Sequence, residues 1–503
     1  MNIKKLTVTA LALVLVSAAL FVGCKKDSGS AENKGPAELR YGFTSEPTTL
    51  DPLSAANTAD GRSILFNVFE GLVKPDTDGN MQPAIAERWT IEQNGLVYNF
   101  TLREGVKFHD GSIVTIKDAE FALNAAIKEK FPGFTRIEKV EALGSRDIRI
   151  TLKAPDTEFL TYLTIGIVPA GNADREKNPI GTGPFIIESY TPQQSLVLKK
   201  NPDYWNTGLP KLDKVTLVFA ADSDALLLSL QGGNIDGAGV TGSLLEQIDE
   251  ARYDIVSSNS NSVQLLALNN AVKPLEDVRV RQAINYAIDV NEIIETAFYG
   301  RGYASGSALI PGLTTYYNKS LANPYPVDVS RARALLAEAG YAKGFNLEIT
   351  VPSNYTMHVD TAQVAVNQLA KAGISATIRL VDWATWLSDV YYGRKYEATI
   401  ISLDAGTVSP RGFLSRYRSD AGDNFINFKS ADYDRAYDAA QKETDDGRRT
   451  AFYQDAQKAI SDDAASVYIQ DIQSFKVFPK GRYGGVVNYP LYVFDFSTIY
   501  KER

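Results

Sequence analysis

The hydrophobic positions of this chain follow two periods, one typical of strands and one typical of helices. Every second residue is apolar in short segments such as 98–102, 345–351 and 376–380, which predicts half-buried strands. In 278–294 apolar residues recur every three or four positions instead, which predicts one amphipathic helix or two consecutive ones. Strands and helices alternate from about 275 to 400, whereas the first half of the chain is richer in strands and turns.

Helix boundary signals support the alternating pattern in the second half. Asp328 or Ser330 can cap a helix that ends at Gly340, and a second helical stretch, 361–372, ends at Gly373. A strand is expected shortly after each of these glycines. Helices that alternate with strands form a mostly parallel sheet covered by helices. We therefore expect an α/β fold with a strand-rich insertion in the first half.

The chain begins with a strongly apolar stretch. Two lysines precede residues 6–22, which are apolar apart from two threonines and one serine. This pattern is typical of a secretory signal, since a membrane-spanning helix needs about 20 apolar residues. Cys24, the only cysteine of the sequence, follows almost directly. An uncleaved anchor with an incidental cysteine is the alternative, and both interpretations place the body of the protein outside the cytoplasm.

Length, charge and residue counts restrict the class of protein. The 503 residues exceed the roughly 150 residues of a typical domain, so two or more packed units are expected. A net charge of −8 offers no basic surface for phosphates, so nucleic acid is not an expected partner. One cysteine and two histidines cannot build disulfide frameworks, zinc clusters or thiol redox pairs. No metal and no cofactor is therefore expected.

Motifs that could carry catalysis fail in their context. Residues 237–242 (GAGVTG) fit the dinucleotide fingerprint, but a helical pattern precedes them where a strand is required, so a glycine-rich turn is predicted. Residues 76–80 (DTDGN) match a calcium loop only in part, and a turn is again predicted. The two histidines, His109 and His358, do not neighbour a recognisable nucleophile. Paired carboxylates remain open, so a lipid-anchored hydrolase is kept as a remote alternative.

Six short motifs occur in a fixed order along the chain. They are EPTTLDP at 46–52, FHDGS with TIKDA at 108–119, GTGPF at 181–185, NPDYW at 201–205, RQAINYAID at 281–289 and ALLAEAG at 334–340. Together they resemble the bacterial extracellular solute-binding proteins of the oligopeptide/dipeptide/nickel class. The resemblance implies a two-lobed, non-catalytic α/β protein of the periplasmic binding type, with an extra strand-rich domain in the first lobe. Its lobes would close over a ligand and deliver it to an ABC permease.

The resemblance also implies how the chain is divided. It implies a lipoprotein signal peptide at 1–23, a flexible linker at 24–38, a first lobe at 39–68, 181–270 and 489–503, an additional α+β domain at 69–180, and a second lobe at 271–488. The start resembles a lipobox, with Phe21 where leucine is usual, so Cys24 is the expected site of lipid attachment. The protein would then be a monomer anchored to the cell membrane by lipid, facing the periplasm or the cell exterior.

Two parts of the ligand site carry over from peptide-binding members of the class. A strip after the LDP motif corresponds to Asn57 and Thr58, and a segment after the first long strand of the second lobe corresponds to Asn354, Tyr355 and His358. Packing between lobes is the alternative role for Tyr355. A place on a helix surface is the alternative for His358.

The third part of the site departs from the pattern of the class. Peptide-binding members use a tryptophan and an aspartate here, and the aspartate holds the peptide's amino group. Leu403 occupies the place of the tryptophan, Gly406 that of the aspartate, and Asp404 lies two positions earlier. An ammonium in a closed cleft needs an anionic partner. The default ligand is an oligo- or dipeptide, and binding of its amino group then requires Asp404 or another acid to supply the negative charge. A sugar or a metal chelate is the alternative ligand.

Overall fold

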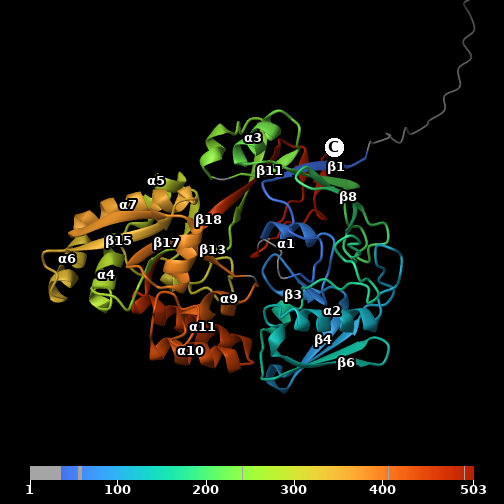
Figure 1. Ribbon diagram of the computed structural model, residues 1–503, viewed down its shortest axis with the longest axis horizontal. Coiled ribbons are helices and arrows are strands. Elements are labelled where there is room, and N and C mark those ends of the chain that lie inside the picture. The colour runs from blue at the N-terminus through green and yellow to red at the C-terminus, as the bar shows by residue number, and fades with distance from the viewer. Residues whose placement is uncertain (1–35, 55–58, 241, 406, 492, 503) are drawn as a thin grey trace, which may run out of the picture. The chain divides into compact units, whose positions relative to one another are not determined.

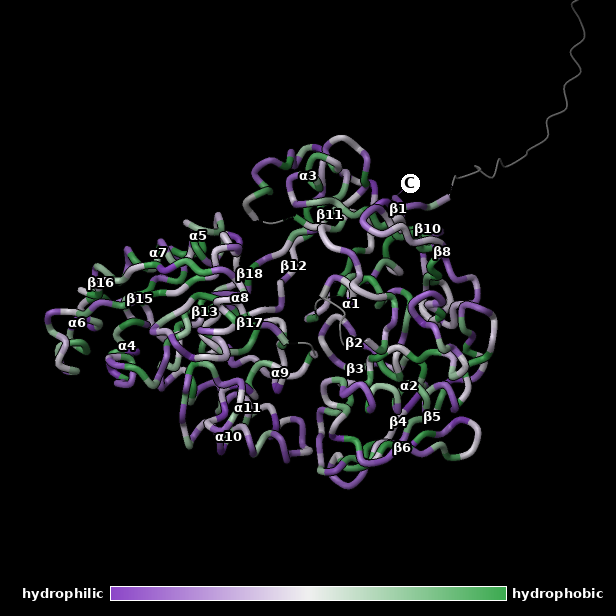
Figure 2. Tube along the Cα trace, in the orientation of Figure 1, coloured by the Kyte–Doolittle hydropathy of each residue, from purple (hydrophilic) through white to green (hydrophobic). Residues whose placement is uncertain are grey.

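A computed structural model describes residues 36–54, 59–240, 242–405, 407–491 and 493–502 (Figure 1). The chain separates into a unit Met1–Pro36, of which only Pro36 is described, and a compact unit Ala37–Arg503. The predicted signal peptide, Cys24 and most of the predicted linker therefore lie outside the described residues. Among the described helices, none combines the length and the apolar character needed to cross a membrane. Hydrophobic and hydrophilic residues are interspersed along the compact unit (Figure 2).

A twelve-stranded sheet runs through the compact unit. One part, called here the first half-sheet, contains β1 (Glu38–Phe43), β8 (Phe185–Thr191), β9 (Ser195–Lys200), β10 (Lys214–Phe219) and β11 (Gly237–Val240). The other part, called the second half-sheet, contains β13 (Ser262–Leu268), β15 (Phe345–Pro352), β16 (Ile374–Val381) and β17 (Ala398–Asp404). Strand β18 (Ser466–Pro479) joins them, and β12 (Tyr253–Asn259) and β14 (Gly302–Ala304) pair with it.

Strand β18 belongs to both half-sheets. Its first residues pair antiparallel with β13, from Ala267 opposite Ser466 to Gln264 opposite Gln470. Its last residues pair with β11 and β12, where Lys476 lies opposite both Gly239 and Val256. A single continuous strand thus carries the hydrogen bonding of the sheet from one half to the other.

Helices cover the second half-sheet on both faces (Figure 1). Leu266 and Leu268 pack in one buried cluster with residues of the first set of helices, and Val263 and Leu265 pack in another with residues of the second set. The first set is α4 (Val278–Ala287), α5 (Val290–Phe298), α6 (Val329–Glu338) and α7 (Thr356–Ala372). The second set is α9 (Pro410–Leu414), α10 (Ala431–Lys442) and α11 (Asp446–Asp462). Between β16 and β17 lie α8 (Trp383–Thr385) and a π-helical turn (Trp386–Tyr392).

The predicted boundaries in this region are confirmed with small shifts. The 278–294 pattern forms two helices, because Asp289 caps α5 by accepting hydrogen bonds from the backbone of Asn291 and Glu292. Asp328, rather than Ser330, caps α6. Helix α7 ends at Gly373, whose φ of +94° is the left-handed conformation that favours glycine. The same helix begins at Thr356, earlier than the predicted stretch 361–372.

The predicted glycine-rich turn at 237–242 is wrong, because residues Gly237–Val240 form strand β11. Helix α3 (Ser223–Gln231) precedes it, as the sequence pattern indicated. A side chain at position 237 would lie 2.6 Å from the ring of Phe478, so close packing explains the glycine. Residues 76–80 form the predicted turn, in which the Asp76 carboxylate accepts hydrogen bonds from the backbone of Asp78 and Asn80.

A separate four-stranded antiparallel sheet follows the order β4-β5-β7-β6. Its strands are β4 (Ala86–Glu92), β5 (Val97–Leu102), β6 (Ile137–Leu143) and β7 (Asp147–Leu152), and α2 (Ile116–Lys128) contributes to the same core. The remaining elements are α1 (Ala59–Leu65), β2 (Val73–Pro75), β3 (Met81–Pro83), β19 (Tyr483–Gly484) and β20 (Tyr500–Lys501). Short 3₁₀ turns lie at Gln93–Gly95, Phe134–Arg136, Phe159–Tyr162, Gly242–Gln247, Lys319–Leu321 and Ser415–Tyr417.

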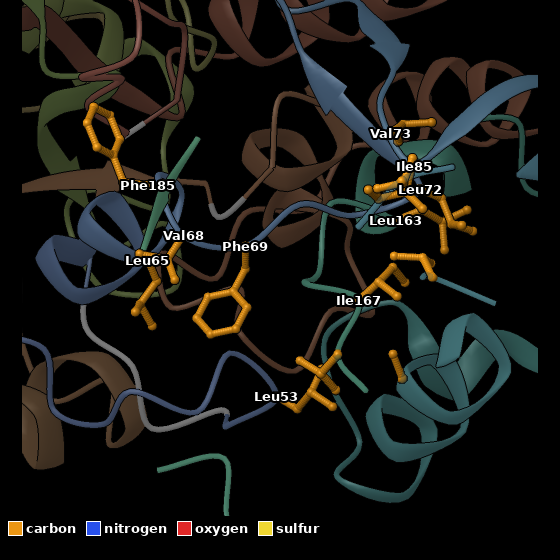
Figure 3. Packing of buried hydrophobic residues seen from close by; sticks show 14 of the residues in the cluster. Leu53, Leu65, Val68, Phe69, Leu72, Val73, Ile85, Leu163, Ile167 and Phe185 are labelled. Carbon is orange, nitrogen blue, oxygen red and sulfur yellow. The ribbon is translucent and has the colours of Figure 1, made fainter. Parts of the chain in front are cut away.

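One buried cluster connects the four-stranded sheet with the first half-sheet (Figure 3). Phe69 and Ile167 lie in this cluster together with Phe185 of β8. The C-terminal segment returns to the same place, because the Asn67 side chain donates to the Phe494 carbonyl and accepts from the Phe496 backbone. Residues more than 400 positions apart in sequence thereby complete one core.

The NPDYW motif surrounds a buried acid in this core. Tyr204 Oη and Trp205 Nε1 each donate to the Glu70 carboxylate at 2.7 Å. Lys74 lies 3.8 Å away, and burial raises the pKa of Glu70 in spite of these partners. The motif therefore anchors a loop of the first half-sheet to the segment that enters β2.

Glu70→Ala should destabilise the protein, because Tyr204 and Trp205 would each lose their acceptor. Leaving buried donors unpaired costs about 1–3 kcal/mol each, so we expect a loss of about 2–6 kcal/mol in the free energy of unfolding. Urea unfolding followed by circular dichroism measures this change. Glu138→Ala, at an exposed position of β6, is the matched control and should change little. Equal stability of the two variants would contradict the anchoring role.

Candidate functional site

Several predicted ligand residues meet at one edge of the second half-sheet. Strands β15, β16 and β17 are parallel, so their carboxyl ends lie at the same edge. Asn354 and Tyr355 follow the end of β15, His358 lies in the first turn of α7, and Asp404 is the last residue of β17. Ligands of open α/β sheets bind outside the carboxyl ends of the strands. The structure thus brings these four residues to the kind of place where a ligand binds.

Tyr355 belongs to an aromatic cluster. Its ring centroid lies 5.4 Å from that of Trp383 in an edge-to-face arrangement and 5.6 Å from that of His358. Trp383 in turn stacks on Trp386 at 5.0 Å and remains 37% exposed. Sequence reasoning missed Trp383. Its position directly after the predicted strand 376–380 was the available signal, since it marks a third strand end at the same edge.

His358 is buried, so its alternative place on a helix surface is wrong. Its Nδ1 lies 3.1 Å from the side-chain nitrogen of Gln264, which also donates to Thr361. Gln470 of β18 donates to the other side of Gln264 at 2.8 Å. Burial lowers the pKa of His358 to about 4, so the ring is neutral near pH 7 and accepts the amide hydrogen of Gln264. Through Gln264, His358 therefore connects α7 to β18.

Leu403 and Asp404 lie on opposite faces of β17. Leu403 is buried in the apolar cluster that includes Val263, whereas Asp404 is exposed. The Asp404 backbone carbonyl accepts a hydrogen bond from Arg416, and its carboxylate has no hydrogen-bond partner within the described part of the chain. The carboxylate is therefore available to a cation from outside. Gly406, Asn57 and Thr58 lie outside the described residues, and their place in the site stays a prediction.

The turn between β12 and β13 lies beside this edge. Ser262, the first residue of β13, is paired with Asp404 across the sheet. The buried Asp471 of β18 holds the turn by accepting from Ser260 Oγ at 2.9 Å and from the Ser262 backbone at 3.4 Å. Burial raises the pKa of Asp471 to about 7. These hydrogen bonds therefore attach the β12–β13 turn, through which the chain passes from one half-sheet to the other, to β18.

A buried ionic cluster joins the four-stranded sheet region to the helices of the second half-sheet. Arg411 of α9 forms an ion pair with Asp156, which also pairs with Arg136 at 2.7 Å. Glu158 accepts hydrogen bonds from the hydroxyls of Ser409 and Tyr453. Burial alone would raise the pKa of Asp156, but the hydrogen bond and charge of Arg411 outweigh it and hold the pKa below its usual value.

Sequence reasoning did not find this cluster. A single arginine in the otherwise apolar stretch 410–414 was the available signal, because a charge among apolar residues needs a buried partner. The identity of that partner, some 250 residues earlier, is visible only in the fold.

The architecture places the chain in a known structural class, the two-lobed periplasmic binding proteins. The chain shares 26% identity with the Listeria monocytogenes ABC transporter substrate-binding protein CtaP, with a TM-score of 0.83 over 93% of this chain and 100% of that one. It shares 26% identity with DppA from Helicobacter pylori in complex with the peptide STSA, with a TM-score of 0.73 over 93% and 99% of the two chains. The predicted α/β fold of this type is confirmed.

The chain belongs to the bacterial extracellular solute-binding proteins, family 5, whose family model matches residues 80–425. Among curated relatives, the glutathione-binding protein GsiB of Salmonella typhi is 29% identical over 439 residues, 82% of this chain and 85% of that protein. The predicted family is thereby confirmed. Its role is that of the substrate-binding component of an ABC importer, so the chain acts by binding a solute.

Arg411→Met should loosen the contact between the two regions that the ionic cluster joins. Asp156 would keep only the half-exposed Arg136, and removing one partner of a buried ion pair costs roughly 3–5 kcal/mol. Small-angle scattering of the ligand-free protein should show a larger radius of gyration than wild type. Arg435→Met, at an exposed position of α10 where it pairs with Asp432, is the matched control. A radius unchanged in both variants would show that the cluster does not hold these regions together.

Proposed function

We propose that this protein captures a short peptide outside the cytoplasm and delivers it to an ABC permease. The observation that carries the proposal is the edge of the second half-sheet, where the exposed carboxylate of Asp404 lies at the same strand ends as the exposed ring of Trp383. A peptide offers matching chemistry, since its ammonium pairs with a carboxylate and its side chains pack on an aromatic ring. The names of the relatives, which bind glutathione and the peptide STSA, support a peptide ligand.

In this proposal Asp404 takes over a task that other peptide-binding members assign two positions later, where Gly406 stands. The hydrogen bond from Arg416 to the Asp404 carbonyl fixes the end of β17 and leaves the carboxylate exposed. Tyr355, Asn354 and His358 would form the wall that faces Asp404. Asn57 and Thr58 would contribute from the opposite lobe.

The proposed motion is closure of two lobes about the strands that join them. The first lobe would comprise 39–68, 181–270 and 489–503, with the additional domain at 69–180 and the second lobe at 271–488, except that β13 pairs within the second half-sheet and the last residues of β18 within the first. Supporting this division, Asn67 binds the backbone of the C-terminal segment 494–496, and the four-stranded sheet lies entirely within 86–152. The protein would act as a monomer and release its ligand unchanged.

Isothermal titration calorimetry tests the proposal with trialanine, glutathione, maltose and a nickel–histidine chelate. We expect a peptide to bind and to be recovered intact. N-acetylation of trialanine should weaken its binding to wild type by about tenfold to a hundredfold, because a charge-assisted hydrogen bond is worth about 1.5–3 kcal/mol. Asp404→Asn should weaken free trialanine by a similar factor and the acetylated form much less.

The matched control is Asp420→Asn, at an exposed aspartate that pairs with Arg418 away from the strand ends. It should bind both forms of trialanine as wild type does. If wild type binds both forms equally and Asp404→Asn changes neither affinity, Asp404 does not hold an amine. Binding of only the sugar or the chelate would replace the peptide as ligand, and hydrolysis of a peptide would favour the enzyme alternative.

We also propose that Cys24 carries lipid and holds the mature protein at the outer face of a cell membrane. The predicted linker 24–38 would end before the compact unit, which begins at Ala37 and whose strand β1 begins at Glu38. The sequence pattern of residues 1–24 supports this proposal. Cys24→Ala should release folded protein into the soluble fraction. Fractionation followed by immunoblotting measures the release, with Ser28→Ala as control. Retention of Cys24→Ala on membranes at the wild-type level, resistant to salt washing, would argue for an uncleaved anchor.

A further inference from the structure

A cavity of about 240 Å³ lies at the carboxyl ends of strands in the first half-sheet. Strands β1 and β11 are parallel, and the residues at their ends, Thr44 and Val240, line the cavity. Lys476 of β18 and Asn259, which precedes the β12–β13 turn, line it as well. The same strand-end rule that places a ligand at Asp404 therefore places one here.

Lys476 is the one basic residue among the described residues that line this cavity; Asp60, whose carboxylate accepts a hydrogen bond from Ser45, lines it as well. Its ammonium donates to Asn488 Oδ1 at 2.8 Å and lies 4.9 Å from the centre of the Phe494 ring. No described carboxylate forms an ion pair with it, and burial without a nearby opposite charge lowers its pKa to about 8. An ammonium has three donors, and the hydrogen bond to Asn488 uses one. The side chain thus retains donors for an anionic oxygen.

Two opposite charges consequently border one turn. The turn at Ser260 and Asn261 joins β12 to β13; Asn261 lines the cavity of Lys476, and the next residue, Ser262, pairs with Asp404. The carboxylate of Asp404 thus belongs to the second half-sheet and the ammonium of Lys476 to the first. A solute that carries both an amine and an acid has complementary charges.

We propose that Lys476 binds a carboxylate of the captured solute. The ligand is then a short zwitterion or acid, and the first half-sheet recognises its negative charge. This inference rests on the proposed function for the amine at Asp404. It assigns the solute's acidic group to a separate site. A purely structural lysine, held by Asn488 and Phe494, would not distinguish an acid from its amide.

The test compares three pools of tripeptides built from Gly, Ala, Ser and Leu. One has free carboxyl termini, one is amidated at the C-terminus, and one is amidated but contains a single aspartate. Dose-dependent thermal shifts give the affinity of wild type for each pool. We expect the free-acid pool to bind about tenfold to a hundredfold more tightly than the amidated pool, as a charge-assisted hydrogen bond predicts. Equal rescue by the aspartate pool would assign the site to side-chain carboxylates.

Variants at the strand end show which residue makes this distinction. Lys476→Met should abolish the preference for the free acid, and Lys476→Arg should retain part of it. Lys480→Met is the matched control, because the exposed ammonium of Lys480 donates to the Glu250 carbonyl. A folded Lys476→Met that keeps the wild-type preference would overturn the proposal.

A second measurement does not depend on peptides. Lysines are labelled by reductive ¹³C-methylation, and the resonance missing from Lys476→Arg identifies Lys476. We expect a saturable shift of this resonance with acetate and none with acetamide. If no tripeptide pool binds, the proposed peptide function fails, and the titration with acetate then tests the Lys476 site alone. A saturable shift of the Lys476 resonance with acetate would support the carboxylate site. No shift would overturn it. The same measurement decides if Lys476→Met does not fold.

Discussion

Strand β18 is the constraint on which both half-sheets depend. A buried strand must satisfy its backbone hydrogen bonds along its whole length, and β18 does so with β13 at one end and with β11 and β12 at the other. Side chains of the same strand contact both candidate sites. Gln470 and Asp471 hold the network of His358 and the β12–β13 turn, and Lys476 lines the cavity of the first half-sheet.

Buried polar groups help to determine which segments of this chain pack against each other. Glu70 orients the NPDYW loop, and Gln264 links α7 to β18. The ion pair between Arg411 and Asp156 joins two regions that are far apart in sequence. Each group would be costly without its partner, so each favours one arrangement of the chain over alternatives. Apolar packing supplies the cores, and these polar contacts determine which surfaces meet.

Local patterns made the second half of the fold predictable, because its signals act within a few residues. The 3.6-residue period of 278–294 and the glycine at 373 identified helices and their ends from neighbouring positions alone. The glycines at 237–242 misled, because the space at Gly237 is taken by the ring of Phe478, far away in sequence. Asn354, Tyr355 and Asp404 were predicted from the resemblance to peptide-binding members of the family. Trp383 follows a predicted strand, but only the fold shows that its ring contacts Tyr355, and the Asp156–Arg411 pair likewise required knowledge of which segments meet in space.

The late position of β18 has a consequence for how the protein is made. Strands β1 and β11 lie within the first 240 residues, but their sheet is complete only when residues 466–479 arrive, and the core around Asn67 also waits for Phe494 and Phe496. Pairing across such long stretches of chain slows folding. A chain emerging from the ribosome therefore exposes unpaired strand edges until residues 466–479 have been synthesised. Fragments that end before β18 would leave both half-sheets with open edges, which are the places where chains aggregate.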